Sequence, residues 1–225
     1  TMPITKHNYF VSSVSELADT IREAFRIAKS GRPGPVLIDI PKDVQTAIGD
    51  YEPHDVVGMA PQGRVSDAEI EAAAKLINAA EKPYIYIGGG AAGEGMADII
   101  CALAEKIDGY VGCTFMGLSC LPCSYERYLG MEGMHGHYAS SMANKDADLV
   151  IGVGVRFSDR ATGNTAKYCP NAKIIQLDTD LSEINKNIKV DAGLIGDIVD
   201  SFARLLDKCE ENQHPEWRAH IEALR

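Results

Sequence analysis

The chain has 225 residues, of which 45% are hydrophobic and 24% charged, a composition typical of one large globular domain or of one domain with part of another. The net charge of −10 and the absence of a basic stripe argue against nucleic acid as a partner. No window approaches 18 consecutive apolar residues and none resembles a signal peptide, so we expect no membrane partner and a cytoplasmic location. A location in a plastid or mitochondrion remains an alternative, because a cleaved transit peptide would leave no trace in this sequence.

A helix and a strand are the first elements that the sequence predicts. A capping box at Ser13–Glu16 opens the helix, and its apolar face recurs at Leu17, Ile21 and Phe25. The apolar run 36–40 then predicts a buried strand. No third element lies nearby, so residues 1–45 are expected to be the C-terminal remnant of a domain whose body lies upstream, and residues 46–65 a linker.

Strands and helices alternate after residue 66. Ser66 and Glu69 form a second capping box, which opens a helix. Alternation of this kind predicts an α/β domain over residues 66–212, with a parallel sheet covered on both faces, and residues 213–225 are expected to form a C-terminal helix or linker. The expected strands are 83–87, 110–115, 149–153, 173–177 and 194–195, and the expected helices are 94–107, 138–145, 181–187 and 198–209.

The segment 88–93 fits the pattern G-x-G-x-x-G, between a predicted strand and a predicted helix. Such glycines, here Gly88, Gly89 and Gly90, let a phosphate approach backbone amides near the start of a helix. The acid that usually follows about 20 residues later in dinucleotide-binding folds is missing, which weakens an NAD interpretation. A tight turn that binds no ligand is the alternative.

A second cluster follows the strand 149–153. Gly154 is followed by Arg156, Asp159 and Arg160, and arginine forks suit phosphate oxygens. Since the carboxyl ends of parallel strands are where ligands bind, two such clusters favour a dinucleotide lying across the edge. The alternative is a solvated, salt-bridged loop.

Three further residues follow predicted strands or precede predicted helices. Asp178 stands where an acid accepts hydrogen bonds from ribose hydroxyls, although Asp180 next to it fits a helix cap. Asp197 fits either an adenine contact or a cap. His135 lies in a loop with no nucleophile or acid at an instructive spacing, so we expect it to contact a ligand or cap a helix rather than to catalyse.

The six cysteines include one C-x-x-C pair, Cys120 and Cys123. This spacing suits a redox pair or half a zinc site, but no second pair follows it. Buried thiols of a reducing cytosol are the favoured interpretation, and no metal site is predicted.

Together these segments resemble the large catalytic subunit of acetolactate synthase, a thiamine-diphosphate enzyme. Residues 3–7 and 30–44 resemble the end of its pyrimidine-binding domain. Its FAD-binding middle domain is matched by 88–90, 114–117, 133–136 and 154–163. The resemblance implies a Rossmann-like, three-layer α/β/α domain with a mostly parallel sheet of six strands.

The resemblance also implies the site residues, with FAD in a structural role and no net redox chemistry. The substrate channel would be lined by Lys42, Met134, Asp159 and Arg160. No catalytic residue falls in this segment. The implied FAD contacts are Arg32, Gly88, Gly89, Gly90, Thr114, Met134, His135, Gly154, Arg156, Asp178 and Asp197.

The implied parent condenses two pyruvates, or pyruvate and 2-oxobutyrate, with loss of carbon dioxide, in branched-chain amino acid biosynthesis. Thiamine diphosphate and Mg²⁺ belong to the full-length parent, because no Gly-Asp-Gly appears here and the activating glutamate lies upstream. The segment alone is therefore expected to be inactive. The resemblance also implies that the parent is a homodimer or homotetramer and that it can bind a regulatory subunit. It implies no nucleic acid and no membrane as partners.

The sequence leaves two alternatives to acetolactate synthase. The first is another thiamine-diphosphate enzyme with the same architecture, either pyruvate oxidase, which has redox FAD, or oxalyl-CoA decarboxylase, which has ADP in its middle domain. The second is a different class of protein, a structural domain that binds no ligand. Three positions also depart from the family pattern. Glu132 replaces a common leucine close to the expected flavin path, Ser158 replaces a frequent aspartate, and Asp178 replaces a frequent glutamate. We expect the extra Glu132 carboxylate to weaken FAD binding.

Overall fold

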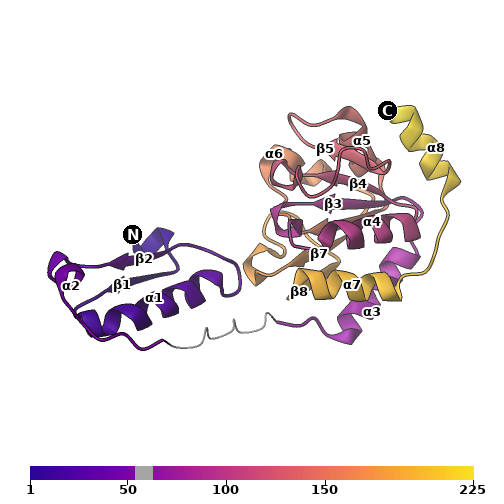
Figure 1. Cartoon of the computed structure of the whole chain (residues 1–225). Helices are drawn as coiled ribbons and strands as arrows, with labels where there is room; N and C mark the ends of the chain where they lie inside the picture. The colour runs from indigo at the N-terminus through magenta and orange to yellow at the C-terminus, as the bar shows by residue number, and fades with distance from the viewer. Residues whose placement is uncertain (54–62) are drawn as a thin grey trace. The chain divides into compact units, whose positions relative to one another are not determined.

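The computed structural model describes residues 1–53 and 63–225, which belong to two separate compact units, 1–62 and 63–225 (Figure 1). Positions 54–62 of the predicted linker lie outside the described residues. In the two described stretches no helix is long and apolar enough to cross a membrane.

The first unit is a parallel β-α-β arrangement. Strand β1 (His7–Phe10) pairs with β2 (Val36–Asp39), and helix α1 (Val14–Lys29) connects them. A 3-10 turn, η1 (Met2–Ile4), precedes β1, and a short helix, α2 (Lys42–Thr46), follows β2. The sequence predicted the helix and the second strand but missed β1, in which polar His7 and Asn8 dilute the apolar signal.

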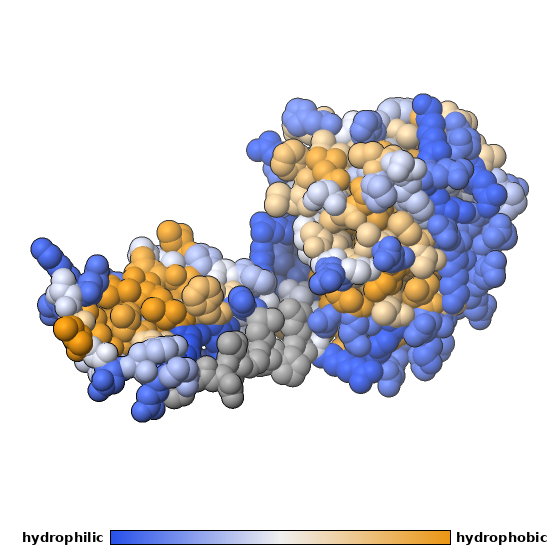
Figure 2. Space-filling view, in the orientation of Figure 1, coloured by the Kyte–Doolittle hydropathy of each residue, from blue (hydrophilic) through white to orange (hydrophobic). Residues whose placement is uncertain are grey.

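Two details of α1 differ from the sequence prediction. The predicted capping box is wrong: the Ser13 hydroxyl accepts a hydrogen bond from the Ser15 amide (3.3 Å), whereas the Glu16 carboxylate accepts one from the Ser12 hydroxyl (3.1 Å). Phe25, expected on the buried face, is 62% exposed. Figure 2 shows apolar surface on this unit. Phe10 of β1 and Leu37 of β2 are among its exposed apolar side chains.

The second unit contains one sheet of six strands, all parallel, in the order β5-β4-β3-β6-β7-β8. The predicted α/β class and the six-stranded sheet are confirmed. Strand β5 was not predicted, because Gly130 interrupts it with φ +81° and the register shifts beside it. The strands are β3 (Pro83–Ile87), β4 (Tyr110–Cys113), β5 (Tyr128–Met131), β6 (Leu149–Val153), β7 (Lys173–Asp178) and β8 (Ala192–Ile195).

Alternate residues of the central strands enter two different cores. Ile85 and Ile87 of β3 pack under α3 (Asp67–Asn78), α4 (Met96–Lys106) and α7 (Ile198–Lys208), whereas Tyr84 and Tyr86 point to the opposite face. That second face is covered by α5 (Tyr138–Asp146) and α8 (Pro215–Leu224), as Figure 1 shows in part. Burial on both faces explains why β3 and β6 have continuous apolar sequences.

Local polar contacts decide where several helices begin. The capping box that opens α3 is confirmed: the Ser66 hydroxyl accepts from the Glu69 amide (3.3 Å), and the Ser66 amide donates to the Glu69 carboxylate (3.0 Å). The predicted helix 181–187 is wrong in extent, since only a 3-10 turn, η5 (Leu181–Glu183), forms before Asn185 adopts a φ of +59°.

Helix α8 packs against the sheet domain. Trp217 is 1% exposed, and its indole Nε1 donates to the Pro83 carbonyl (3.2 Å). Near the start of β4, the fully buried Asp108 carboxylate pairs with Arg127 (2.8 Å) and Arg218 (2.9 Å). The chain beyond residue 212 is therefore fixed to the amino edge of the sheet by both apolar and ionic contacts.

Candidate functional site

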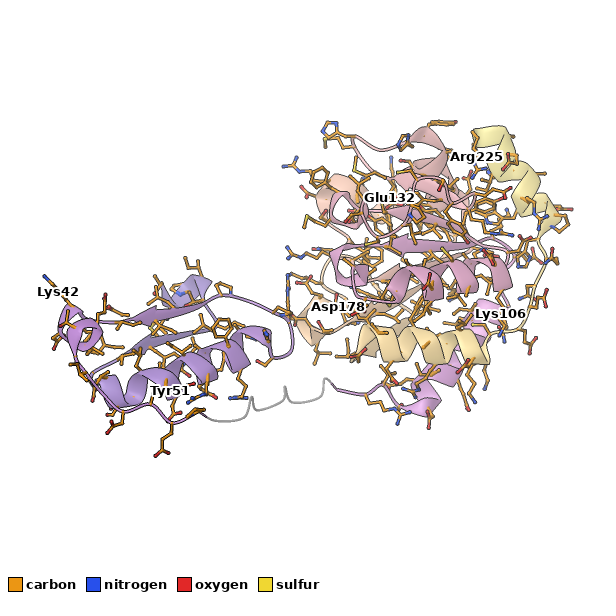
Figure 3. The ribbon with its side chains drawn as sticks, in the orientation of Figure 1. Lys42, Tyr51, Lys106, Glu132, Asp178 and Arg225 are labelled. Atoms are coloured by element: carbon orange, nitrogen blue, oxygen red, sulfur yellow. The ribbon has the colours of Figure 1, made fainter. Side chains whose placement is uncertain are left out.

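The candidate site is the carboxyl edge of the sheet, called the rim below. Because all six strands are parallel, their carboxyl ends lie on one edge. Five residues named from the sequence lie at strand ends: Gly88 after β3, Thr114 after β4, Gly154 after β6, Asp197 two residues after β8, and Asp178 as the last residue of β7. The rim brings these positions together, together with the loop 133–136 after β5. Figure 3 labels Asp178 at the end of β7.

The glycine turn after β3 contacts the end of β6 and Gly154 backbone to backbone. The Gly88 amide donates to the Val153 carbonyl (2.9 Å), and the Gly90 amide donates to the Gly154 carbonyl (3.2 Å). A Cβ on Gly90 would lie 2.7 Å from the Gly154 Cα, and Gly154 has a φ of +58°. These glycines thus serve first to let two loops approach each other, a role that the sequence prediction of phosphate contact did not include.

The helix that follows the glycines does not begin at them. A 3-10 turn, η2 (Gly89–Ala91), comes first, and α4 begins at Met96 after Gly95 in the left-handed region. The N-terminus of α4 is therefore not directly at the glycine turn. The turn itself presents Gly89 and Gly90 as exposed backbone at the rim.

Thr114 fixes the end of β4 against β3. Its amide donates to the Ile87 carbonyl (2.8 Å), and its hydroxyl accepts from the Gly117 amide (3.2 Å), which closes the 3-10 turn η3 (Phe115–Gly117). The turn leaves Phe115 and Met116 with exposed fractions of 73% and 70%. The rim therefore carries apolar side chains beside its glycines.

The loop 154–160 after β6, called the arginine loop below, is anchored by one buried aromatic ring. Phe157 has a φ of +46° and is 2% exposed, and its ring fills the space that a side chain at Gly152 would need. This anchor leaves Arg156 and Arg160 exposed on either side. A non-glycine residue in this conformation is strained, and burial of the ring offsets the cost.

The loops 133–136 and 154–160, which carry three of the expected channel residues, are hydrogen-bonded to each other. The Met134 amide donates to the Arg160 carbonyl (2.9 Å), and a Cβ on Gly133 would lie 2.6 Å from that same oxygen. Met134 is 65% exposed, and Asp159 begins the short helix α6 (Asp159–Thr162). Met134, Asp159 and Arg160 are therefore neighbours, and His135 is exposed beside Met134.

The two aspartates at the β7 and β8 ends differ. Asp178 is 9% exposed, burial raises the pKa of its carboxyl group, and Oδ1 accepts from the Asp180 amide (2.9 Å). Asp197 caps α7, with Oδ1 accepting from the Asp200 amide (2.9 Å), and Asp180 caps η5. Capping is thus the role that the structure shows for Asp197 and Asp180.

Glu132 follows β5 but does not face solvent. It is 5% exposed, and burial raises the pKa of its carboxyl group to about 8, against the opposing effect of hydrogen bonds from Asn144 and Tyr84. Figure 3 labels it within the sheet unit. The sequence singled out this position, but nothing in it indicated that the carboxyl group turns inward.

Arg32 and Lys42 belong to the first unit. The Arg32 carbonyl accepts from Lys6 Nζ (3.1 Å), and Lys42 is the exposed first residue of α2, labelled in Figure 3. Their expected parts in the site stay predictions.

The cysteines occupy different environments. Cys113 is buried, with Sγ 2.9 Å from the Tyr128 hydroxyl, and burial raises its pKa to about 11. Cys120 is half-buried and Cys123 exposed. Among residues 1–53 and 63–225 no group of three or more histidine, cysteine or acidic side chains is placed to hold a metal ion.

Residues 70–205 match the thiamine pyrophosphate enzyme central domain, and the chain belongs to this family.

The relatives narrow the family further. The acetolactate synthase isozyme 1 large subunit of Escherichia coli K12 is 42% identical over all of this chain and 40% of its own length. The acetolactate synthase large subunit of Corynebacterium glutamicum is 40% identical over all of this chain and 37% of its own length. The probable acetolactate synthase large subunit of Methanocaldococcus jannaschii is 42% identical over 91% of this chain and 36% of its own length. The chain thus spans about two fifths of the length of these relatives, and the resemblance seen in its motifs is confirmed.

Proposed function

We propose that this chain is the nucleotide-binding middle module of an acetolactate synthase large subunit and that FAD lies along its rim. The observation that carries this proposal is the gathering of glycine turns, exposed Arg156 and buried Asp178 on one edge of a parallel sheet. Exposed backbone and an arginine suit a diphosphate, and a carboxylate at a strand end suits ribose hydroxyls.

The residues present fit an adenine dinucleotide, with one revision of the expected roles. The Gly88 and Gly90 amides already donate to the carbonyls of Val153 and Gly154, so the diphosphate would rely on Arg156 and on the exposed Gly89. Phe115, Met116 and Met134 would supply apolar surface for an aromatic ring system. FAD would be held as a structural group.

The reaction belongs to the whole parent. There, thiamine diphosphate and Mg²⁺ would support condensation of two pyruvates, or of pyruvate and 2-oxobutyrate, with loss of carbon dioxide. Lys42, Met134, Asp159 and Arg160 would line the substrate channel, and Arg32 would add a flavin contact. We also propose a cytoplasmic homodimer or homotetramer that can take a regulatory subunit. The chain by itself would have no carboligase activity.

Calorimetric titration with FAD and with ADP tests the module directly. We expect weak binding through the adenosine half, so ADP should bind about as tightly as FAD. Arg156→Gln should weaken both ligands about tenfold, the usual value of a charge-assisted hydrogen bond. Lys167→Gln removes an exposed cation elsewhere and should change neither. Nanomolar FAD binding would contradict the weak-binding part, and no binding of either ligand would contradict the function.

A further inference from the structure

Glu132 is held by polar groups from three separate parts of the second unit. The Tyr84 hydroxyl of β3 donates to Glu132 Oε2 (3.2 Å), and the Asn144 amide of α5 donates to the same oxygen. The Tyr168 hydroxyl donates to Oε1 (3.4 Å). Asn144 also donates to the Tyr168 hydroxyl (2.7 Å), so these residues form one connected cluster, called the Glu132 cage below.

The surroundings of the Glu132 cage are uncharged. Within the described chain, no lysine or arginine lies within ion-pair distance of Glu132, whose side chain is almost fully buried. A buried carboxylate without a cation is costly, because hydrogen bonds replace only part of the lost hydration. The titratable or polar groups that face it are Tyr84 and Tyr86 of β3, Cys113 of β4, Ser140 and Asn144 of α5, and Tyr168 and Cys169.

The proton state of Glu132 is therefore open to change near neutral pH. Burial raises the pKa of its carboxyl group to about 8, and the same cause raises the pKa values of Tyr84, Tyr86 and Tyr168. Those tyrosines stay neutral when Glu132 ionises. Negative charge would then appear in a compartment that offers only neutral donors.

The Glu132 cage contacts two loops of the rim, 133–136 after β5 and 154–160 after β6. Gly133 follows Glu132 directly, and its amide donates to the Ser141 hydroxyl (3.3 Å). On the other side, the Tyr168 ring packs edge-on against Phe157, the anchor of the arginine loop, with centroids 5.9 Å apart. A shift in the cage would therefore reach Met134 through the chain and Arg156 through Phe157.

We propose that Glu132 is a positioning residue whose proton makes the rim sensitive to pH: the neutral acid holds the loops at 133–136 and 154–160 together, and the carboxylate loosens them. The inference rests on the proposed function only in naming an adenine dinucleotide as the ligand that loses affinity. Two effects act in the same direction, since the ionised cage draws in water and its charge repels a diphosphate.

FAD titrations of the 225-residue chain at pH 6, 7, 8 and 9 test the inference. If the neutral form is the one that binds, the dissociation constant should rise about tenfold between pH 7 and pH 9. In Glu132→Gln, which keeps the shape and cannot ionise, it should change less than twofold. Glu126→Gln, the same substitution at an exposed site before β5, should follow the unsubstituted chain. An equal rise in Glu132→Gln, or no rise in the unsubstituted chain, would overturn the inference.

A second measurement does not depend on any ligand. The chain has seven methionines, and the methyl carbon resonance of Met134 can be assigned by its loss in Met134→Leu. We expect this resonance to shift with pH at the same midpoint as the Glu132 carboxyl carbon, and to lose the shift in Glu132→Gln. Linked titrations without FAD binding would leave the positioning role standing while removing the proposed function. A Met134 resonance that ignores Glu132 would overturn the inference whatever FAD does.

Discussion

The Tyr84 hydroxyl lies in the space that a Cβ at Gly112 would occupy. The Ser140 hydroxyl, 2.9 Å from the Tyr84 oxygen, would also lie only 2.5 Å from that Cβ. A glycine in the middle of β4 thus makes room for a buried hydrogen bond between β3 and α5. Isolated glycines in strands often mark such close approaches, and this is the signal from which the contact could have been predicted.

Gly112→Ala should destabilise the sheet unit by about 1–3 kcal/mol, because the new methyl group displaces the Tyr84 hydroxyl from both its partners. Urea unfolding followed by circular dichroism measures the change. Adding Tyr84→Phe should recover part of the loss, so the two substitutions should be non-additive. Gly93→Ala is the control, since its Cβ would meet only ordinary contacts from 3.4 Å. Additive effects would show that the two residues do not share this space.

Gly154→Ala should disturb the rim more than the core. The substitution places a methyl group against the Gly90 backbone at a φ of +58°, which we expect to cost about 1–3 kcal/mol. Adenine nucleotide binding should fall at least tenfold in calorimetry, while Gly93→Ala, whose Cβ would meet only ordinary contacts, should bind normally. Undiminished binding in folded Gly154→Ala would show that the close approach of these loops is not needed for the ligand.

Asp108→Asn should release α8. The side chain keeps its shape but leaves Arg127 and Arg218 without their carboxylate, for an expected loss of about 3 kcal/mol. Trp217, the single tryptophan, is buried and precedes Arg218 in α8, so its emission should shift to the red at lower urea concentration. The exposed Asp207→Asn should unfold like the unsubstituted chain. Unchanged tryptophan emission throughout would contradict this anchoring role.

The Asp108 carboxylate should also make the free energy of unfolding decrease at acidic pH. Burial opposes ionisation of Asp108, but hydrogen bonds from the His214 amide and from the two arginines prevail and hold its pKa below the ordinary value. Its contribution is therefore complete above about pH 4 and is lost as the pH falls through the lowered folded pKa. Asp108→Asn should flatten this acid limb of the stability curve.

Glu132 should change the free energy of unfolding in the opposite direction, with less stability as the pH rises. Its folded pKa of about 8 exceeds the ordinary value of 4.5, so the folded state retains a proton that the unfolded chain loses. Stability from this group is complete below about pH 4.5 and decreases as the pH rises toward 8. Between pH 5 and 7 the unsubstituted chain should lose about 3 kcal/mol relative to Glu132→Gln. Parallel urea stabilities for the two proteins across that range would rule out a raised pKa at Glu132.

Much of the fold follows from the sequence, because buried parallel strands give continuous apolar runs and their helices give periodic ones. Strand β3 and strand β6 were predicted with their observed bounds. The missed strands, β1 and β5, lack that signal: one contains His7 and Asn8, and the other is broken by Gly130. Helix 181–187 failed because Asn185 turns the chain before a second turn can form.

The sequence predicted which residues lie at the rim, but not the contacts that these residues make. Strand ends fixed the positions of Gly88, Gly154 and Asp178 along the chain, and the parallel sheet brings them to one edge. That the glycines pack against each other depends on the φ of Gly154 and on the adjacency of β3 and β6, which no local pattern encodes. The inward turn of Glu132 likewise depends on Tyr84 and Tyr168, which lie far away in the sequence.

Hydrogen–deuterium exchange of the 225-residue chain with and without saturating FAD tests the central proposal most directly. We expect slower exchange at the strand ends alone, in the peptides that cover 88–91, 114–117, 154–157 and 178–180, with α8 unchanged. Protection at the amino edge near Asp108, or none at any peptide while FAD is saturating, would contradict a nucleotide site on the rim.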